Sequence, residues 1–256
     1  VAECFDALLG RVDGAAARII WNIRIPRLLA ALIAGAGLSV SGLVMQTTLG
    51  NAMASPSTLG VSNAAVFGAN LSIIAFSGGF LSTGNNLSIA VGAMWTAATT
   101  VLQFYATDVG LSAAVIWSFG DLGRATYRTD WIMLAVVTAG TVFFMLLAWR
   151  YNALLSGGDT AGTLGVNVAL LRFVSLLTAS VMTAVCVSFL GIIGFVGIIC
   201  PHTVKRLMGQ DHRWSIPASA LSGSLLLLLA DLLSRSLGSG SALPVGAITS
   251  LLGAPF

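Results

Sequence analysis

The side chains that could carry acid–base or metal chemistry are few in this sequence and do not form a catalytic pattern. The two histidines, His202 and His212, lie ten positions apart with no third residue at metal-ligand spacing. His202 follows Pro201 at an expected helix bend, which favours a hydrogen-bonded structural histidine over a catalytic or proton-relay role. We therefore expect no metal, no cofactor and no enzyme active site in this chain.

Nucleotide and nucleic-acid chemistry are also disfavoured by the sequence. The phosphate-binding pattern G-x-x-x-x-G-K-[ST] does not occur, so ATP binding by a P-loop is excluded. Lys205 is the single lysine, and the arginines are scattered rather than clustered, which argues against nucleic acid as a partner. Cys186 and Cys200 fall in apolar runs and form no C-x-x-C pair, as expected of small apolar fillers.

One pair of charges stands inside an apolar stretch. Asp231 and Arg235 are four residues apart, so on a helix they share a face and can form an ion pair. A charge in hydrocarbon is costly and is usually paired or near the interface. The pair predicts either an interfacial contact near a helix end or an Arg235 that projects outward to meet a partner.

The elements that hold these residues must be membrane helices. Hydrophobic residues make up 57% of the 256 residues, charged residues only 8%, and the mean hydropathy is +0.94; a soluble domain carries about 25% charged residues. Residues 28–107 contain no Asp, Glu, Lys or Arg, which leaves room for three spans of about 20 residues. The apolar runs are continuous rather than alternating, which favours helices over a β-barrel.

The apolar runs divide the chain into nine predicted helices separated by breakers. Six of them are predicted spans, at residues 28–45, 58–76, 87–106, 131–149, 170–189 and 216–237. A short interfacial helix is expected at 111–119, a helix after the glycine-rich break at 192–207, and a last helix from 243 to 256. Between the fourth and fifth spans, residues 150–167 form a glycine-rich polar loop.

Several motifs, taken together and in order, resemble the FecCD-type permease family, the membrane subunits of ABC importers for iron-siderophores, haem and vitamin B12. The motifs lie at residues 24–30, 41–46, 51–62, 159–166, 194–202, 211–213, 229–231, 243–249 and 253–256. Each motif alone is weak, but their common order from Arg24 to Phe256 makes the resemblance strong.

The resemblance implies an all-α, polytopic transmembrane bundle with about ten spans in the intact subunit and fewer in these 256 residues. It implies a homodimer with the path for a metal chelate on its two-fold axis. Two ATPase subunits on the cytoplasmic side, an external or periplasmic substrate-binding protein and membrane lipid would be its partners. The expected location is a bacterial or archaeal cytoplasmic membrane. Residues 1–256 then form a single permease domain that lacks the family's first helix, one internal helix near 106–107 and the C-terminal end.

The same resemblance assigns three groups of site residues. Arg24, Arg27 and Arg235 would dock acidic residues of the binding protein, and the first two have no acid neighbours in sequence. Asn51 and Met53 would form a cytoplasmic gate. Asp159, Ala161, Leu164 and Gly165 would contact the ATPase, with Ala161 and Leu164 forming a small apolar face.

Two other classes of protein stay open. A secondary transporter driven by an ion gradient usually carries buried acids in mid-span, and Asp231 comes closest to that position. An integral membrane enzyme would need converging nucleophiles, metal ligands or paired carboxylates, which the sequence does not display. Dependence of uptake on ATP separates the three.

Overall fold

The computed structural model describes residues 15–56, 87–237 and 243–253. Within these ranges every regular element is a helix, which confirms the predicted all-α bundle. The predicted span at 58–76 lies outside the described residues. The elements in chain order are α2 (Ala15–Ile19), the π-helical η1 (Ile20–Arg24), α3 (Ile25–Leu49), α5 (Leu87–Phe104), α6 (Asp108–Ser118), the 3₁₀ helix η2 (Leu122–Arg124), α7 (Tyr127–Leu146), α8 (Ala148–Leu155), α9 (Gly158–Thr163), α10 (Val168–Leu190), α11 (Val196–Met208), α12 (His212–Leu237) and α13 (Val245–Gly253).

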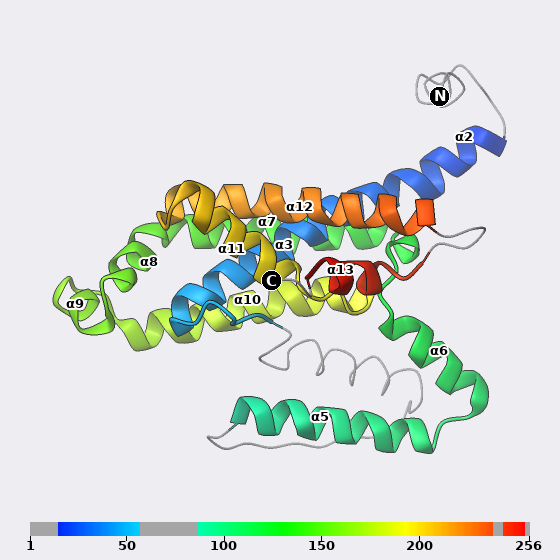
Figure 1. Cartoon of the computed structure of the whole chain (residues 1–256), viewed down its shortest axis with the longest axis horizontal. Helices are drawn as coiled ribbons and strands as arrows, with labels where there is room; N and C mark the ends of the chain where they lie inside the picture. The colour runs from blue at the N-terminus through cyan, green and yellow to red at the C-terminus, as the bar shows by residue number, and fades with distance from the viewer. Residues whose placement is uncertain (1–14, 57–86, 238–242, 254–256) are drawn as a thin grey trace.

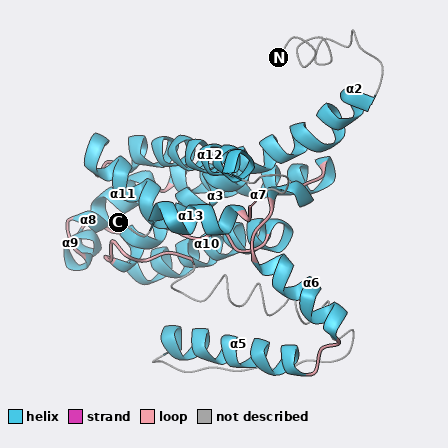
Figure 2. Ribbon diagram, turned by 45° about the vertical axis from the view of Figure 1, so that its right-hand side comes forward, coloured by secondary structure: helices cyan, strands magenta, loops and turns pink. Residues whose placement is uncertain are grey.

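Four helical stretches in the described part of the chain are long and apolar enough to cross a membrane. They are Ala17–Leu49, Tyr127–Leu146, Val168–Leu190 and His212–Leu237. Each overlaps a span predicted from the charge-free runs. In Figure 1, α3, α7, α10 and α12 lie side by side along the long axis of the molecule. Figures 1 and 2 both show α5 set apart from this bundle and joined to it through α6.

Helix α3 is the centre of the bundle, and small residues allow its neighbours to approach closely. A Cβ on Gly35 would lie 2.3 Å from the carbonyl oxygen of Gly223 on α12. A Cβ on Gly42 would lie 1.9 Å from the carbonyl oxygen of Gly197 on α11. Such backbone contact is how membrane helices gain packing energy, because lipid provides no hydrophobic force between them.

The break between α10 and α11 follows the predicted run of glycines. Gly191 ends α10 with φ +79°, and its missing Cβ leaves room for the carbonyl oxygen of Trp117. Phe195 caps α11 with φ +65°, the one positive φ of a non-glycine residue in the described chain. At the end of α10, the Leu190 carbonyl accepts the N–H of Asp121, which lies between α6 and η2, at 2.8 Å. The last carbonyl group of α10 is therefore paired although the helix stops there.

The predicted polar loop at 150–167 is mostly helical, so that prediction was wrong in its extent. Helix α8 follows α7 with only Leu147 between them, and the six-residue helix α9 follows after Ser156 and Gly157. Gly157 has φ +107°, a conformation that favours glycine. The glycine content of this segment indicated a loop because glycine has a low helix propensity. Packing against neighbouring helices can stabilise a helix despite that low propensity.

Candidate functional site

A cluster of four charges lies where the first turns of α3 meet the last turns of α12. Arg27 Nε donates to Asp231 Oδ1 at 2.6 Å, and Arg235 Nη2 lies 2.7 Å from Asp231 Oδ2. Asp121 is 3.9 Å from Arg27 and half-exposed, whereas the Asp231 side chain is only 1% exposed. The predicted Asp231–Arg235 pair is therefore confirmed. Through its contact with Arg27, Asp231 also links α12 to α3.

Arg27 has no acid neighbour in sequence, but the fold places two carboxylates beside it. Its two carboxylate partners stand far away in sequence, Asp231 by 204 positions, and only the packing of α12 and η2 on α3 brings them together. The Arg27 side chain is 13% exposed and that of Arg235 is 38% exposed. Arg24 is exposed on the π-helical turn that precedes α3. Their predicted contact with a binding protein stays a prediction.

The predicted gate residues lie in a tight turn at the opposite end of α3. Gly50 ends the helix in the left-handed conformation, and Asn51 N–H donates to the Gln46 carbonyl at 3.1 Å. The Asn51 side chain accepts the Met53 N–H at 2.9 Å. Both residues are exposed, Met53 to 61%. The turn is thus ordered by its own hydrogen bonds while its side chains are presented outward.

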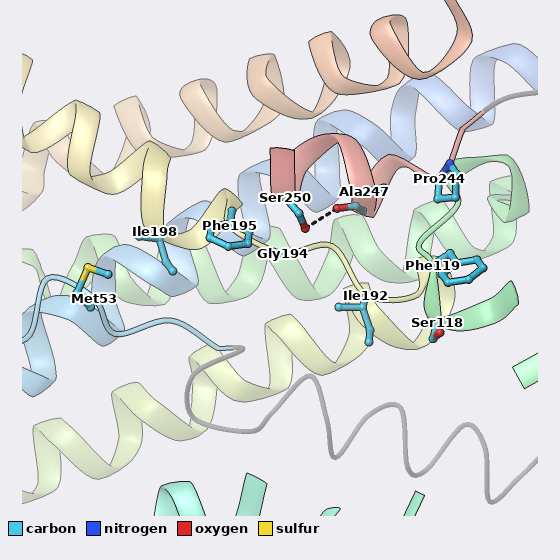
Figure 3. A pocket seen from close by; sticks show the side chains of 11 residues that line it. Met53, Ser118, Phe119, Ile192, Gly194, Phe195, Ile198, Pro244, Ala247 and Ser250 are labelled. Atoms are coloured by element: carbon cyan, nitrogen blue, oxygen red, sulfur yellow. Dashed lines mark hydrogen bonds between the residues drawn. The ribbon is translucent and has the colours of Figure 1, made fainter. Parts of the chain in front are cut away.

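Met53 also borders a pocket of about 600 Å³ on one face of the bundle. Figure 3 shows its walls, which come from the α10–α11 break, from α13 and from the end of α6. Phe195 and Ile198 line it near Met53, and Phe119 and Pro244 line its far end. The described residues that line it are mostly apolar, and none of them is charged. In the described part of the chain no three His, Cys, Asp or Glu residues are placed to hold a metal ion.

The predicted ATPase-contacting residues lie on and after α9, but they do not form the expected apolar face. Asp159, Leu164 and Gly165 are exposed, Leu164 to 54%. Ala161 is 0% exposed and belongs to the hydrophobic core of this chain. The predicted Ala161–Leu164 face is therefore wrong, because α9 folds back on α8 and turns Ala161 inward. A charge at Ala161 would disturb the permease itself.

A buried polar network joins α8, α12 and α3 near the gate turn. His212 is 0% exposed; its backbone N–H and its Nδ1 both lie 2.9 Å from Asn152 Oδ1. Its Nε2 lies 2.8 Å from Thr47 Oγ1. Sequence reasoning placed His212 in a charged turn and missed this role. The motif at residues 211–213 was the available signal.

Two charged residues, Asp211 and Lys205, lie beside this network, and both are outside the predicted spans. Asp211 accepts the Arg213 N–H at 3.0 Å and the Asn152 amide at 2.7 Å, which lowers the pKa of its carboxyl group. A lowered carboxyl pKa contributes stability above the pKa of the unfolded chain, and this contribution disappears as the solution becomes acidic. Lys205 Nζ donates to Gln46 Oε1 at 3.1 Å, and burial lowers the pKa of Lys205 to about 8. His202 is exposed, and its expected hydrogen bond stays a prediction.

These features define a class of protein: a helical membrane subunit with charges clustered at one end and an ordered turn, a buried polar network and an exposed short helix at the other. The sequence model of the FecCD transport family matches residues 1–90 and 87–256. The chain belongs to this family.

Individual relatives agree with the assignment. An ABC transporter permease protein of Methanocaldococcus jannaschii is 42% identical over an alignment of 295 positions that covers 100% of this chain and 84% of the relative. The hemin transport system permease protein of Yersinia pestis is 35% identical over 93% of this chain and 81% of its own length. A vitamin B12 import system permease protein of Escherichia coli is 32% identical over 92% and 81%.

A solved structure supports the fold. It is a metal-chelate type ABC transporter in an inward-facing conformation, with a TM-score of 0.86 and 28% identity over 95% of this chain and 87% of that chain.

The alignments also bear on the internal helix expected to be missing. The M. jannaschii alignment spans 295 positions for 256 residues, so the relative carries residues that this chain lacks. The family match divides at residues 87–90, which are the first residues of α5, whereas the predicted position is 106–107. Its placement at 106–107 stays a prediction.

Proposed function

We propose that this chain is the membrane-spanning permease subunit of a binding-protein-dependent ABC importer that carries a metal chelate such as an iron-siderophore, haem or cobalamin. The observation that carries the proposal is the family match, together with permease relatives named for hemin, iron chelatin and vitamin B12 transport that each align with 92–93% of the chain. The absence of a nucleotide-binding motif in the sequence fits a subunit whose energy comes from separate ATPase chains.

The partners follow from the two ends of the bundle. We place the end with α9 and the gate turn in the cytoplasm, where two ATPase subunits would bind a homodimer of this chain. The opposite end, with Arg24, Arg27 and Arg235, faces outward and would meet acidic residues of the substrate-binding protein. Asn51 and Met53 would close the path at the cytoplasmic side.

Reconstitution into liposomes tests the assignment directly. The permease, its ATPase and its binding protein are combined, and uptake of a labelled iron chelate, haem or cobalamin is followed with ATP or with a non-hydrolysable analogue. We expect uptake only with hydrolysable ATP and with both partners present. Uptake that persists without the ATPase would contradict the proposal.

One observation supports the ion-gradient alternative strongly enough to include its control. Asp130, near the start of α7, is 3% exposed, and its carboxylate oxygens have no hydrogen-bond partner among the described residues. Buried acids in spans are typical of ion-driven transporters. A protonophore and an imposed sodium gradient should leave uptake unchanged if ATP is the energy source.

The proposed contact between the α9 region and the ATPase leads to a separate prediction. Leu164→Asp should weaken ATPase binding, because Leu164 is more than half exposed beside α9 and a carboxylate would have to be desolvated in the partner's groove. We expect binding to fall about tenfold or more, measured by titrating detergent-solubilised permease with ATPase. Leu237→Asp, at the exposed end of α12 and at the opposite end of the bundle from α9, is the matched control and should bind normally. Equal affinity of the two variants would exclude Leu164 from the interface.

A further inference from the structure

The network around His212 links the proposed ATPase contact to the proposed gate. Asn152 lies on α8, which leads through Ser156 and Gly157 into α9. Thr47 lies in the last turn of α3, and the gate turn follows after Gly50. His212, at the start of α12, contacts both side chains. The three residues therefore form a continuous path across three helices.

The direction of the hydrogen bond between His212 and Asn152 is determined by its neighbours. The Asn152 amide nitrogen donates to Asp211 Oδ1 at 2.7 Å, so the amide oxygen faces His212 and accepts from it. Nδ1 of His212 therefore carries a proton. In the neutral ring Nε2 is then an acceptor, and the single proton of the Thr47 hydroxyl is shared between Nε2 at 2.8 Å and the Leu43 carbonyl at 3.0 Å. Every polar atom of the imidazole is satisfied, which makes the arrangement specific rather than interchangeable.

Other buried contacts also hold α8 in place at this end of the bundle. Tyr151, next to Asn152, is 0% exposed; its hydroxyl lies 2.7 Å from Ser175 Oγ on α10, and its ring packs against His212 with centroids 5.5 Å apart. Buried hydrogen bonds of this kind are expensive to leave unmade, because no water replaces them. A displacement of α8 must therefore carry the ends of α3 and α12 with it.

We propose that Asn152, His212 and Thr47 form a relay that transmits movement of α9 to the gate turn at the end of α3. This inference rests on the proposed function, since it needs an ATPase that moves α9. The three side chains are positioning residues, since they would act through the helices that carry them. The motif at residues 211–213 then serves to seat His212 between α8 and α3.

The chain offers a matched pair of threonines to test the relay. Thr47 and Thr48 are both buried in the last turn of α3, and each hydroxyl contacts the carbonyl four residues earlier, Leu43 or Val44. Thr47 alone also contacts His212. Thr47→Val removes this contact with almost no change in shape, and Thr48→Val removes an equivalent local bond without touching the relay. Thr47→Ser retains the hydroxyl.

The variants are assembled with ATPase and binding protein in liposomes, and molecules transported per ATP hydrolysed are measured. We expect Thr47→Val to lower this ratio about fivefold or more, in the range of typical coupling between sites, while ATP is still hydrolysed. Thr48→Val and Thr47→Ser should match the wild type. A second readout is the yield of the disulfide crosslink between the two Met53→Cys positions of the dimer. The difference in this yield between nucleotide states should be smaller in Thr47→Val than in the wild type.

Each other result has a definite meaning. Equal transport ratios in Thr47→Val and Thr48→Val would overturn the relay, as would a Thr47→Ser variant as uncoupled as Thr47→Val. Failure of Thr47→Val alone to assemble would show a folding contact and also overturn it. A wild-type complex without ATP-dependent transport would count against the proposed function instead, so the two failures are distinguishable.

Discussion

Gly42→Ala should prevent α3 and α11 from packing at the centre of the bundle. The added methyl group would lie 1.9 Å from the carbonyl oxygen of Gly197, far inside van der Waals contact, and the obstacle is backbone that no rotamer change can move. The helices would have to separate, which also stretches the contact of Gln46 with the Gly197 carbonyl. We expect a loss of about 3 kcal/mol in stability, the upper range of overpacking effects, seen as a lower melting temperature in detergent.

Gly162→Ala is the control for this prediction. A Cβ at Gly162 meets no atom within 4 Å, and the residue lies inside α9, so alanine should raise local helix stability by about 0.5–1 kcal/mol. The two variants add the same atom in opposite surroundings. If Gly42→Ala melts at the wild-type temperature, the close approach of α3 and α11 is not present in the folded protein.

Asp231→Asn should be the most damaging change among the charged residues. Asparagine leaves the Arg27 guanidinium without its 2.6 Å carboxylate partner, in a site where the arginine side chain is 13% exposed. Breaking one side of a buried ion pair costs about 3–5 kcal/mol, because the remaining charge stays desolvated. We expect a lower melting temperature and reduced yield of folded permease.

Two further variants separate this effect from a general loss of charge. Asp121→Asn removes a half-exposed carboxylate 3.9 Å from the same arginine and should cost about 0–1 kcal/mol. The double change Arg27→Met with Asp231→Leu removes both buried charges and should recover part of the stability lost in Asp231→Asn. Thermal unfolding in one detergent compares all three. Equal destabilisation by Asp121→Asn and Asp231→Asn would refute the central position of Asp231.

The positions of the helices could be predicted well from the sequence. Long runs without charge cannot be solvated, and they cannot cross hydrocarbon except as helices whose backbone groups are paired internally. For this reason the predicted spans at 28–45, 131–149, 170–189 and 216–237 correspond to α3, α7, α10 and α12. The break after Gly191 and the Asp231–Arg235 pair were predictable for equally local reasons, namely glycine conformation and helical spacing.

The contacts between helices were decided only by the tertiary structure. In a soluble helix one apolar stripe identifies the packed face, but a membrane helix is apolar on all sides, so hydropathy does not tell lipid from protein. Nothing in the local sequence shows that Ala161 turns inward, that Arg27 meets Asp231 across 204 positions, or that His212 reaches Thr47 across 165. These contacts exist because α8 and α12 pack against α3 in one register, and that register depends on close approaches such as Gly35 to Gly223.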